Sequence, residues 1–314
     1  MTGPDDEVRW IAADGIRVGV IPFGASLVGV EVPDRLGRPA DVILSLPAAA
    51  DYRDRALNHH LGAMVGRFAN RISGAAFELD GMTHRLVASE GENTLHGGPA
   101  AWGRRDWDVV GHSSGSVTLR LVDADGTGGF PGTVEVEVTY RVESDTLHIE
   151  ASATTDAPTV INMANHAYWN LAGSGTVDGH DLVVAATERL EVGAGLIPTG
   201  ELIPTHIAGP LVGRWDDAVV LEGGAAHGEV AAVQLHDPGS GRVMVVFTDQ
   251  PTLQVYTADG LGPPFGSRGA VCLEAQGFPD APNRPEFPST VLRPGETYQW
   301  WVRHEFGVDQ PFAR

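Results

Sequence analysis

The chain has 314 residues, and its 21 Lys and Arg side chains against 41 Asp and Glu give a net charge of −20. This charge opposes binding to nucleic-acid phosphates and to anionic membranes, because both require a basic surface. All the basic residues are Arg and Cys272 is the one cysteine, which excludes Lys-dependent chemistry and metal sites built from several thiolates.

The first ten residues are acidic and polar, whereas a secretory signal has a basic start and an apolar run of about 7–15 residues. No stretch reaches the roughly 18 apolar residues of a membrane span. A lone cysteine fits a reducing compartment. We therefore expect a cytoplasmic protein.

Apolar and polar residues alternate along much of the chain, which is typical of half-buried strands. One segment, 47–60, has the pattern of a helix, with Pro47 at a suitable first position. Residues 205–229 are Gly-rich and predict a surface loop. In chain order, the expected strands are 16–21, 27–32, 117–121, 134–140, 147–151, 182–186, 230–235, 242–248, 253–257 and 297–306.

These strands predict an all-β fold, a large antiparallel β-sandwich. A doubly wound α/β fold would need helices of about 10–15 residues between the strands, and the sequence lacks them. No internal repeat or linker divides the chain, so we expect one domain over residues 1–314.

Two short motifs have simple structural interpretations. Residues 111–115 match the G-x-S-x-G pattern of a nucleophile elbow, which functions only at a strand-to-helix turn. A strand follows here, so we expect a hairpin turn. His59 and His60 are adjacent, and neighbouring residues do not share a face of a helix or a strand. We therefore expect no metal site at this pair.

Several polar residues are candidates for a ligand site. Arg67 and Arg71, with Asn70 beside them, are either structural partners of carboxylates or donors to a ligand rich in hydroxyl groups. His96 precedes two glycines, which permit either close approach to a ligand or a tight turn, and it is a candidate acid or base.

Two further segments carry titratable groups. In a strand over 162–171, His166, Tyr168 and Asn170 would share one face, which is either a polar site or the surroundings of a core histidine. Glu274 has apolar neighbours, and desolvation would raise its pKa toward that of a general base. The alternative is a Glu on a strand face, paired with an Arg.

Four blocks together resemble the aldose 1-epimerases, also called galactose mutarotases. The blocks are VGRFANRI (65–72), NTLHGG (93–98), NHAYWNL (165–171) and LEAQGFPDAPN (273–283), in the family's order, and the match continues to about residue 298. The resemblance implies a galactose-mutarotase-like supersandwich and an isomerase that interconverts the α and β anomers of free hexoses such as glucose and galactose. It also implies a small-molecule aldose as partner, no cofactor or metal, and a monomer or homodimer.

The resemblance also implies roles for single residues. His166 is similar to the general acid at the ring oxygen, Glu274 to the general base at the anomeric hydroxyl, and His96, Asn70 and Arg71 to sugar ligands near them. The family's binding Asp corresponds to Asp216, with Asp217 as the alternative, because the tripeptide that usually precedes it is absent. Gln254, Tyr256 and Tyr168 belong to the same pocket. We expect an ionised Glu274 and a protonated His166, favoured by the negative net charge.

Three alternatives remain at this point. A glycoside hydrolase would need two carboxylates, and Glu274 with Asp216 is the pair available. A sugar-binding sandwich without turnover would not need an acid and a base together. A related epimerase of another or a phosphorylated aldose would need a cationic clamp, which only Arg could supply in a chain without Lys.

Overall fold

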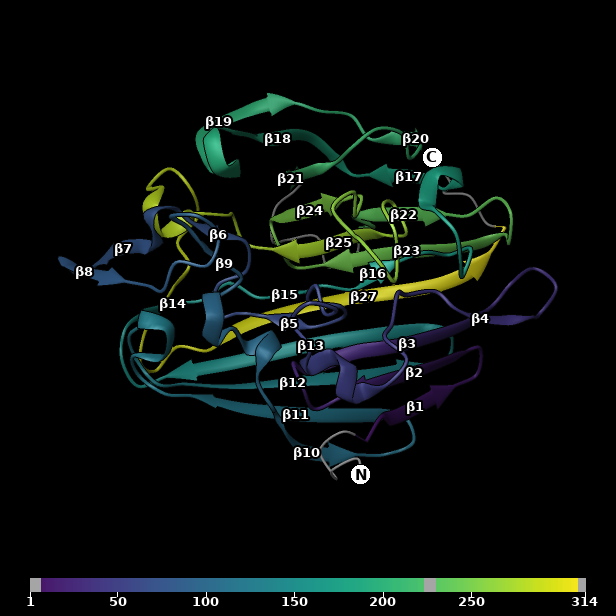
Figure 1. Cartoon of the computed structure of the whole chain (residues 1–314), viewed down its shortest axis with the longest axis horizontal. Helices are drawn as coiled ribbons and strands as arrows, with labels where there is room; N and C mark the ends of the chain where they lie inside the picture. Colours follow the sequence, from purple (N-terminus) through teal and green to yellow (C-terminus); the bar gives the residue numbers. More distant parts are fainter. Residues whose placement is uncertain (1–6, 223–229, 310–314) are drawn as a thin grey trace.

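The computed structural model describes residues 7–222 and 230–309, and antiparallel sheets dominate them (Figure 1). The largest sheet has nine strands in the order β10-β11-β12-β13-β27-β23-β22-β17-β20. Its strands are β10 (Asp108–His112), β11 (Ser116–Asp123), β12 (Val134–Glu143), β13 (Thr146–Thr155), β17 (Asp181–Val184), β20 (Ala208–Pro210), β22 (Val233–His236), β23 (Arg242–Thr248) and β27 (Tyr298–Val308).

Two further sheets face the same interior. A six-stranded sheet has the order β16-β25-β24-β21-β18-β19, and a four-stranded sheet has the order β1-β2-β3-β4. The first contains β16 (Tyr168–Trp169), β18 (Ala186–Val192), β19 (Pro198–Pro204), β21 (Asp216–Leu221), β24 (Thr252–Tyr256) and β25 (Val271–Gln276). The second contains β1 (Arg9–Ala13), β2 (Ile16–Ile21), β3 (Ser26–Pro33) and β4 (Pro39–Asp41).

Short elements connect these sheets. The paired short strands are β5 (Met64–Val65) with β15 (Ala164–Asn165), β6 (Arg71–Ile72) with β9 (Thr94–Leu95), β7 (Ala76–Leu79) with β8 (Met82–Arg85), and β14 (Thr159–Val160) with β26 (Val291–Leu292). The helical turns are η2 (Ala49–Arg53), η3 (Ser73–Ala75), η4 (Gly98–Ala100), η5 (Trp102–Arg104), η6 (Thr127–Gly129), η7 (Val177–Gly179), η8 (Ala194–Leu196) and η10 (Ala281–Asn283). Among the described residues, no helix has the length and apolar character to cross a membrane.

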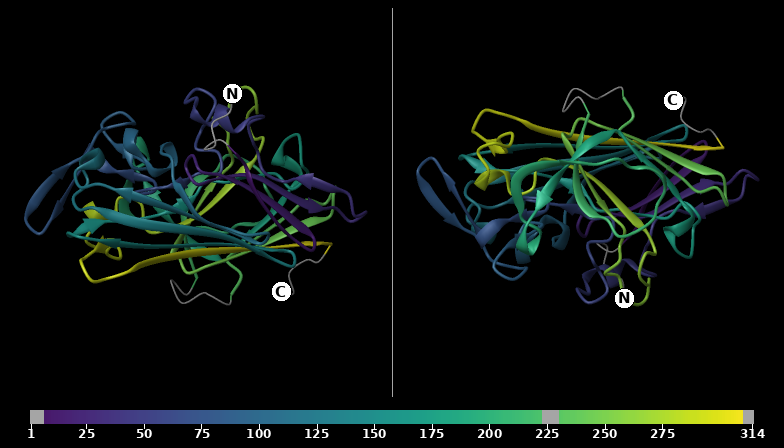
Figure 2. Two further views of the ribbon diagram at one scale, coloured as in Figure 1. Left: turned by 90° about the horizontal axis from the view of Figure 1, so that it is seen from below. Right: turned by 90° about the horizontal axis from the view of Figure 1, so that it is seen from above.

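The sheets curve around one shared hydrophobic core (Figure 2). Alternation produces this arrangement: on β12 the even-numbered positions from Val134 to Val142 are buried, whereas Glu135 and Glu137 are exposed. A polar contact also crosses between two of the sheets. The Trp300 indole on β27 donates to the Ala275 carbonyl on β25 at 2.9 Å. The predicted all-β antiparallel sandwich is confirmed.

Most predicted strands match observed ones, and residues 111–115 form the expected hairpin turn between β10 and β11. The predicted helix over 47–60 is wrong, because only η2 forms there. Asn58 donates from its side chain to the Tyr52 carbonyl at 2.6 Å and accepts from the backbone N–H of Leu61 at 2.9 Å. Such side-chain bonds to nearby backbone compete with helix propagation.

Two further predictions, one of a strand and one of a loop, also need correction. Residues 182–186 do not form one strand, because the chain leaves the nine-stranded sheet after β17 and enters the six-stranded sheet with β18. The predicted loop over 205–229 contains β20 and β21, and β21 lies between β24 and β18 inside its sheet. Residues 223–229 of that segment lie outside the described residues. Asp216 and Asp217 begin β21, and Asp is a residue type that strands disfavour.

Candidate active site

One face of the six-stranded sheet forms the floor of a hollow of about 400 Å³. On β25, Leu273 and Ala275 belong to the hydrophobic core, so Glu274 between them points to the opposite face. Gln254 on β24 pairs with Glu274 in the strand register and lines the same hollow. The lining residues are His59, His60, Asn70, Arg71, Glu90, Leu95, His96, Arg104, His166, Tyr168, Arg214, Asp216, Gln254, Tyr256 and Glu274.

Loops from the first third of the chain supply the opposite wall. His60, Asn70 and His96 have φ values of 62°, 63° and 53°, in the left-handed region that non-glycine residues rarely adopt. Backbone strain of this kind gathers at functional sites. A Cβ on Gly97 would lie 2.2 Å from the Gly66 carbonyl oxygen, so this glycine permits two loops to pack together rather than a close approach to a ligand.

Glu274 and His166 face each other inside the hollow. Their side chains are 3 % and 7 % exposed, and His166 Nε2 lies 3.7 Å from Glu274 Oε1. The His166 ring stacks on Tyr168 with 4.9 Å between ring centroids, and its Nδ1 lies 3.6 Å from Cys272 Sγ. The second carboxyl oxygen of Glu274 is buried without a hydrogen-bond partner. This buried carboxyl therefore has one oxygen free for a ligand.

Burial determines the charge of this pair in the free protein. It raises the pKa of Glu274 to about 8, with a further contribution from the nearby charge of Asp216. It lowers the pKa of His166 to about 4. The expected ionised Glu274 and protonated His166 are therefore wrong for the free site, because desolvation outweighs the attraction of a distant net charge. At neutral pH the pair holds one proton, on the carboxyl group.

His96 is held in one tautomer. The Asn70 backbone N–H donates to His96 Nδ1 at 3.2 Å, so the proton of the neutral ring is on Nε2. Ligand atoms of His96, His166 and Glu274 lie within 4.8 Å of one another, a grouping that resembles a metal site. A protonated nitrogen has no lone pair for a metal. The His96 tautomer thus favours a hydrogen-bond donor over a metal ligand at this position.

A chain of amide hydrogen bonds continues along the floor. The Asn70 side-chain amide donates to Gln254 Oε1 at 3.0 Å, and Gln254 Nε2 donates to Asp216 Oδ1 at 2.9 Å. Asp216 lines the hollow, whereas Asp217 points away from it and forms an ion pair with Arg189. Of the two alternatives for the binding carboxylate, the structure places Asp216 in the hollow.

The two arginines of the predicted donor pair separate. Arg67 is 1 % exposed and bonds Asp123 Oδ2 at 2.8 and 3.0 Å, which makes it a structural residue. Arg71 lines the hollow and bonds the Glu90 carboxylate at 2.6 and 2.9 Å. Of the two interpretations, the structural one applies to Arg67 and the ligand-facing one to Arg71.

The run over 162–171 is not one strand. β15 pairs with β5, and β16 pairs with β25 in another sheet, so the chain turns between them. Asn170 consequently does not share a face with His166 and Tyr168. Its amide donates to the Gly269 carbonyl at 2.8 Å, away from the hollow.

The sequence did not indicate two residues of the pocket wall, His60 and Arg104. The His60 ring lies 5.1 Å from His96 and 6.0 Å from His166, measured between centroids. The adjacent pair His59-His60 was a visible signal, and both residues line the hollow. No sequence pattern indicated Arg104, because it lies beside histidines that come from distant parts of the chain.

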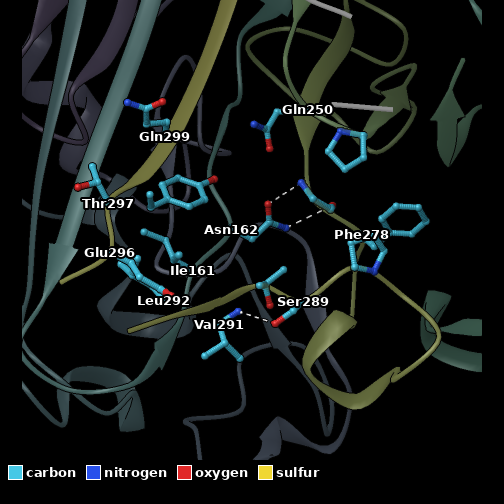
Figure 3. A pocket seen from close by; sticks show the side chains of 15 residues that line it. Ile161, Asn162, Gln250, Phe278, Ser289, Val291, Leu292, Glu296, Thr297 and Gln299 are labelled. Atoms are coloured by element: carbon cyan, nitrogen blue, oxygen red, sulfur yellow. Dashed lines mark hydrogen bonds between the residues drawn. The ribbon is translucent and has the colours of Figure 1, made fainter. Parts of the chain in front are cut away.

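A second hollow of about 490 Å³ lies beside β27 and has a different character (Figure 3). Asn162 is tied there to the backbone of Gly277, whose N–H it accepts at 2.7 Å. The carboxylate in its lining, Glu296, is exposed and has no imidazole among its neighbours there. An acid facing a base within one hollow is a feature of the Glu274 site.

Comparisons with known proteins identify the family of the chain. The model of the aldose 1-epimerase family matches residues 6–305. The chain is 35 % identical to the galactose mutarotase of Sus scrofa over 93 % of this chain and 92 % of that one. It is 32 % identical to the aldose 1-epimerase of Escherichia coli strain K12, with the same coverage of both chains.

The chain belongs to the aldose 1-epimerase family. Solved structures agree with this assignment. The aldose epimerase homologue of C. elegans superposes with a TM-score of 0.91 at 30 % identity and covers 97 % of this chain and 100 % of that one. The galactose 1-epimerase of Lactobacillus acidophilus shares the fold, with a TM-score of 0.84 at 23 % identity and coverage of 99 % and 97 %. The sandwich described above is thus the fold of aldose 1-epimerases.

Proposed function

We propose that the protein is an aldose 1-epimerase that interconverts the α and β anomers of free hexoses, including glucose and galactose. The observation that carries this proposal is the buried pair of Glu274 and His166, 3.7 Å apart. The anomeric hydroxyl and the ring oxygen of a pyranose are both bonded to C1. An acid and a base that serve these two oxygens must therefore lie close together, and this pair does.

The reaction opens the ring and closes it again. The Glu274 carboxylate removes the proton of the C1 hydroxyl while the His166 imidazolium protonates the ring oxygen. The bond from C1 to the ring oxygen breaks and a C1 aldehyde forms. Rotation about C1–C2 and the reverse proton transfers give the other anomer, with no net gain or loss of protons. A positioned acid or base typically contributes about 10²–10⁴-fold.

The single proton of the free pair is sufficient for this chemistry. A neutral carboxyl with a neutral imidazole holds as many protons as a carboxylate with an imidazolium. The active form therefore requires a shift of the proton from Glu274 to His166, and no uptake from solvent. We propose that a sugar oxygen between the two groups assists this shift, because 3.7 Å exceeds a direct hydrogen bond.

The other predicted residues fit as sugar ligands. The Nε2–H of His96 is a donor to the ring oxygen or a hydroxyl group, and the Arg71 guanidinium offers further donors. Asp216 accepts from sugar hydroxyls, while the Asn70 and Gln254 amides hold the floor in position. Tyr168 supports the His166 ring by stacking. Positioning of this kind supplies much of an enzyme's rate enhancement.

We further infer a cytoplasmic enzyme that acts as a monomer or homodimer. The single cysteine is free and buried, which fits a reducing compartment. The acid, the base and the sugar ligands all come from one chain, so a complete site requires no second copy.

Polarimetry of freshly dissolved α-D-glucose and α-D-galactose tests the proposal. Catalytic amounts of the protein should accelerate the approach to equilibrium rotation and release no new product. The appearance of new reducing ends from a glycoside would indicate a hydrolase that uses Glu274 and Asp216. Sugar binding without a change in the rate of mutarotation would indicate a binding protein.

A further inference from the structure

Arg104, at the end of η5, is a guanidinium in the pocket wall without a counter-ion. No hydrogen bond or ion pair of its side chain occurs among the described residues, and its Nη1 is buried without a partner. Its neighbour in the chain, Arg105, bonds Asp123 at 2.5 Å, and Arg71 across the hollow is neutralised by Glu90. Arg214 also lines the hollow without an ion pair among the described residues, but Arg104 is the guanidinium of this wall that has a buried nitrogen without a partner.

Nearby charges make this arrangement costly without a ligand. Burial lowers the pKa of Arg104, and the positive charge of Arg55 lowers it further. Arg55 is exposed, and its guanidinium donates to the Pro99 carbonyl rather than to a carboxylate. A buried donor without a partner costs free energy, and a like charge beside it adds to the cost. An anionic ligand would remove both penalties.

The position of Arg104 identifies the part of the sugar it would contact. Its charge acts on the three imidazoles His60, His96 and His166, whereas the charges that act on Glu274 are those of Asp216 and Arg71. Arg104 thus lies on the histidine side of the hollow. With C1 at Glu274 and the ring oxygen at His166, the next ring atom, C5, and its substituent lie on that same side.

We propose, on the basis of the proposed function, that the pocket takes aldoses whose C5 substituent carries a negative charge, and that Arg104 binds this charge. A hexuronate carboxylate and a hexose 6-phosphate share this chemistry, because guanidinium forms bidentate bonds with both groups. The carboxylate is the shorter group and suits the buried Nη1 of Arg104. A phosphate extends further and would reach the exposed Arg55 as well.

NMR measurement of anomeric exchange tests this proposal with D-galacturonate, D-glucuronate, D-glucose 6-phosphate, D-galactose and D-glucose, after subtraction of the uncatalysed rates. For at least one anionic sugar we expect a kcat/KM about tenfold or more above that of its neutral parent, which corresponds to about 1.4 kcal/mol. Arg104→Gln should reduce this ratio to near one. The matched control is Arg120→Gln, which removes a partly exposed cation on β11 that forms an ion pair with Glu135 on β12, and it should leave the ratio unchanged.

The arms of the experiment separate the two sources of charge. If galacturonate or glucuronate is preferred and depends on Arg104 alone, the ligand is a carboxylate. If glucose 6-phosphate is preferred and Arg55→Gln also lowers its rate, the ligand is a phosphate. Because Arg104 has no partner, Arg104→Gln should melt at or above the wild-type temperature.

Several results would overturn the inference. The inference would be wrong if a neutral hexose had a kcat/KM as high as that of every anionic sugar, and the proposed function would then remain intact. The same holds for an unchanged ratio in Arg104→Gln, or for a lower melting temperature of that variant, which would make Arg104 structural. Absence of turnover with every aldose would overturn the proposed function and this inference together.

Discussion

Glu274 shows how a strand can hold a reactive carboxyl group. Its neighbours in sequence, Leu273 and Ala275, anchor β25 in the core and force the carboxyl group into the hollow on the other face. Burial there makes the charged form costly, which raises the pKa of Glu274 to about 8. The apolar sequence around it predicted this desolvation, and the structure confirms it. Glu274 is thus buried enough for its pKa to be raised, and it still lines the hollow where a ligand could contact it.

Replacement of Glu274 by Gln tests its role as base. The amide has a similar shape but cannot accept the C1 proton, so kcat should fall by about 10²-fold or more. A variant that retains more than about a tenth of the wild-type kcat would contradict the assignment. As a control for folding, the folded wild type keeps a proton between about pH 4.5 and 8 that the unfolded chain releases. The contribution of Glu274 to stability is therefore lost as pH rises through this window. At pH 8 the variant should have a melting temperature equal to or above that of the wild type.

His166 and His96 are expected to differ in the kinetic constant that they control. An interaction made mainly in the transition state lowers kcat, whereas uniform substrate binding raises KM. His166→Asn should therefore lower kcat by about 10²-fold or more, as for a lost general acid. His96→Asn should lose more through KM, because His96 donates one fixed hydrogen bond. Steady-state polarimetry decides between them, and the reverse pattern would exchange the two roles.

The pH dependence follows from the single proton that the pair shares. Below about pH 4 both His166 and Glu274 are protonated, and no base is available. Above about pH 8 both are deprotonated, and no acid is available. The plot of kcat/KM against pH should therefore be bell-shaped, with limbs that belong to the pair rather than to either residue. A rate that stays constant from pH 6 to 10 would rule out this shared proton as the source of catalysis.

At the scale of elements, β21 determines which carboxylate belongs to the site. Neighbouring residues of a strand point to opposite faces, so Asp216 and Asp217 cannot both enter the hollow. The register of β21 with β24 pairs Asp216 with Tyr256, and both line the hollow. The sequence alone left the two residues as alternatives, because the tripeptide that usually precedes the binding Asp is absent, and a shift of register by one residue would exchange their faces.

Asp216→Asn and Asp217→Asn form a matched pair of variants on this strand. Asp216→Asn should raise KM for hexoses by about tenfold or more, because a hydrogen bond to a charged acceptor contributes about 1.5–3 kcal/mol. Asp217→Asn removes only its ion pair with Arg189 and should leave KM within about twofold, since partly exposed ion pairs contribute about 0–1 kcal/mol. Equal effects on KM would show that β21 does not present Asp216 to the sugar.

The elements also show where prediction from sequence ends. Long alternating strands such as β12 were predictable, because their period depends only on local sequence. The different environments of Arg67 and Arg71 were not predictable. Arg67 forms an ion pair with Asp123 and Arg71 forms one with Glu90, and both partners are distant in the sequence. His60 enters the site through a backbone with positive φ, which residue type does not indicate. Local pattern thus predicts the sheets, whereas long-range contacts decide the walls of the pocket.

At the scale of the whole molecule, the acidic surface and the pocket have different electrostatics. The net charge of −20 acts at long range, where salt screens it within about 8–10 Å at moderate ionic strength. Inside the hollow, desolvation and individual partners determine the charge states, as the neutral Glu274 and His166 show. The surface charge therefore affects solubility and the rate of encounter with charged molecules, whereas the local environment of the pocket determines the protonation of the catalytic groups.

We propose that the chain folds as one domain and unfolds as one cooperative unit. Ile11 near the start and Phe306 near the end belong to the same core cluster, together with residues of all three large sheets. The buried Trp102, Trp169 and Trp300 report on a loop, the six-stranded sheet and the nine-stranded sheet. Urea unfolding followed by tryptophan fluorescence and by far-UV circular dichroism should therefore give coincident transitions. Two separated transitions, or a protease-resistant fragment that keeps one of the sheets, would show instead that the chain contains more than one domain.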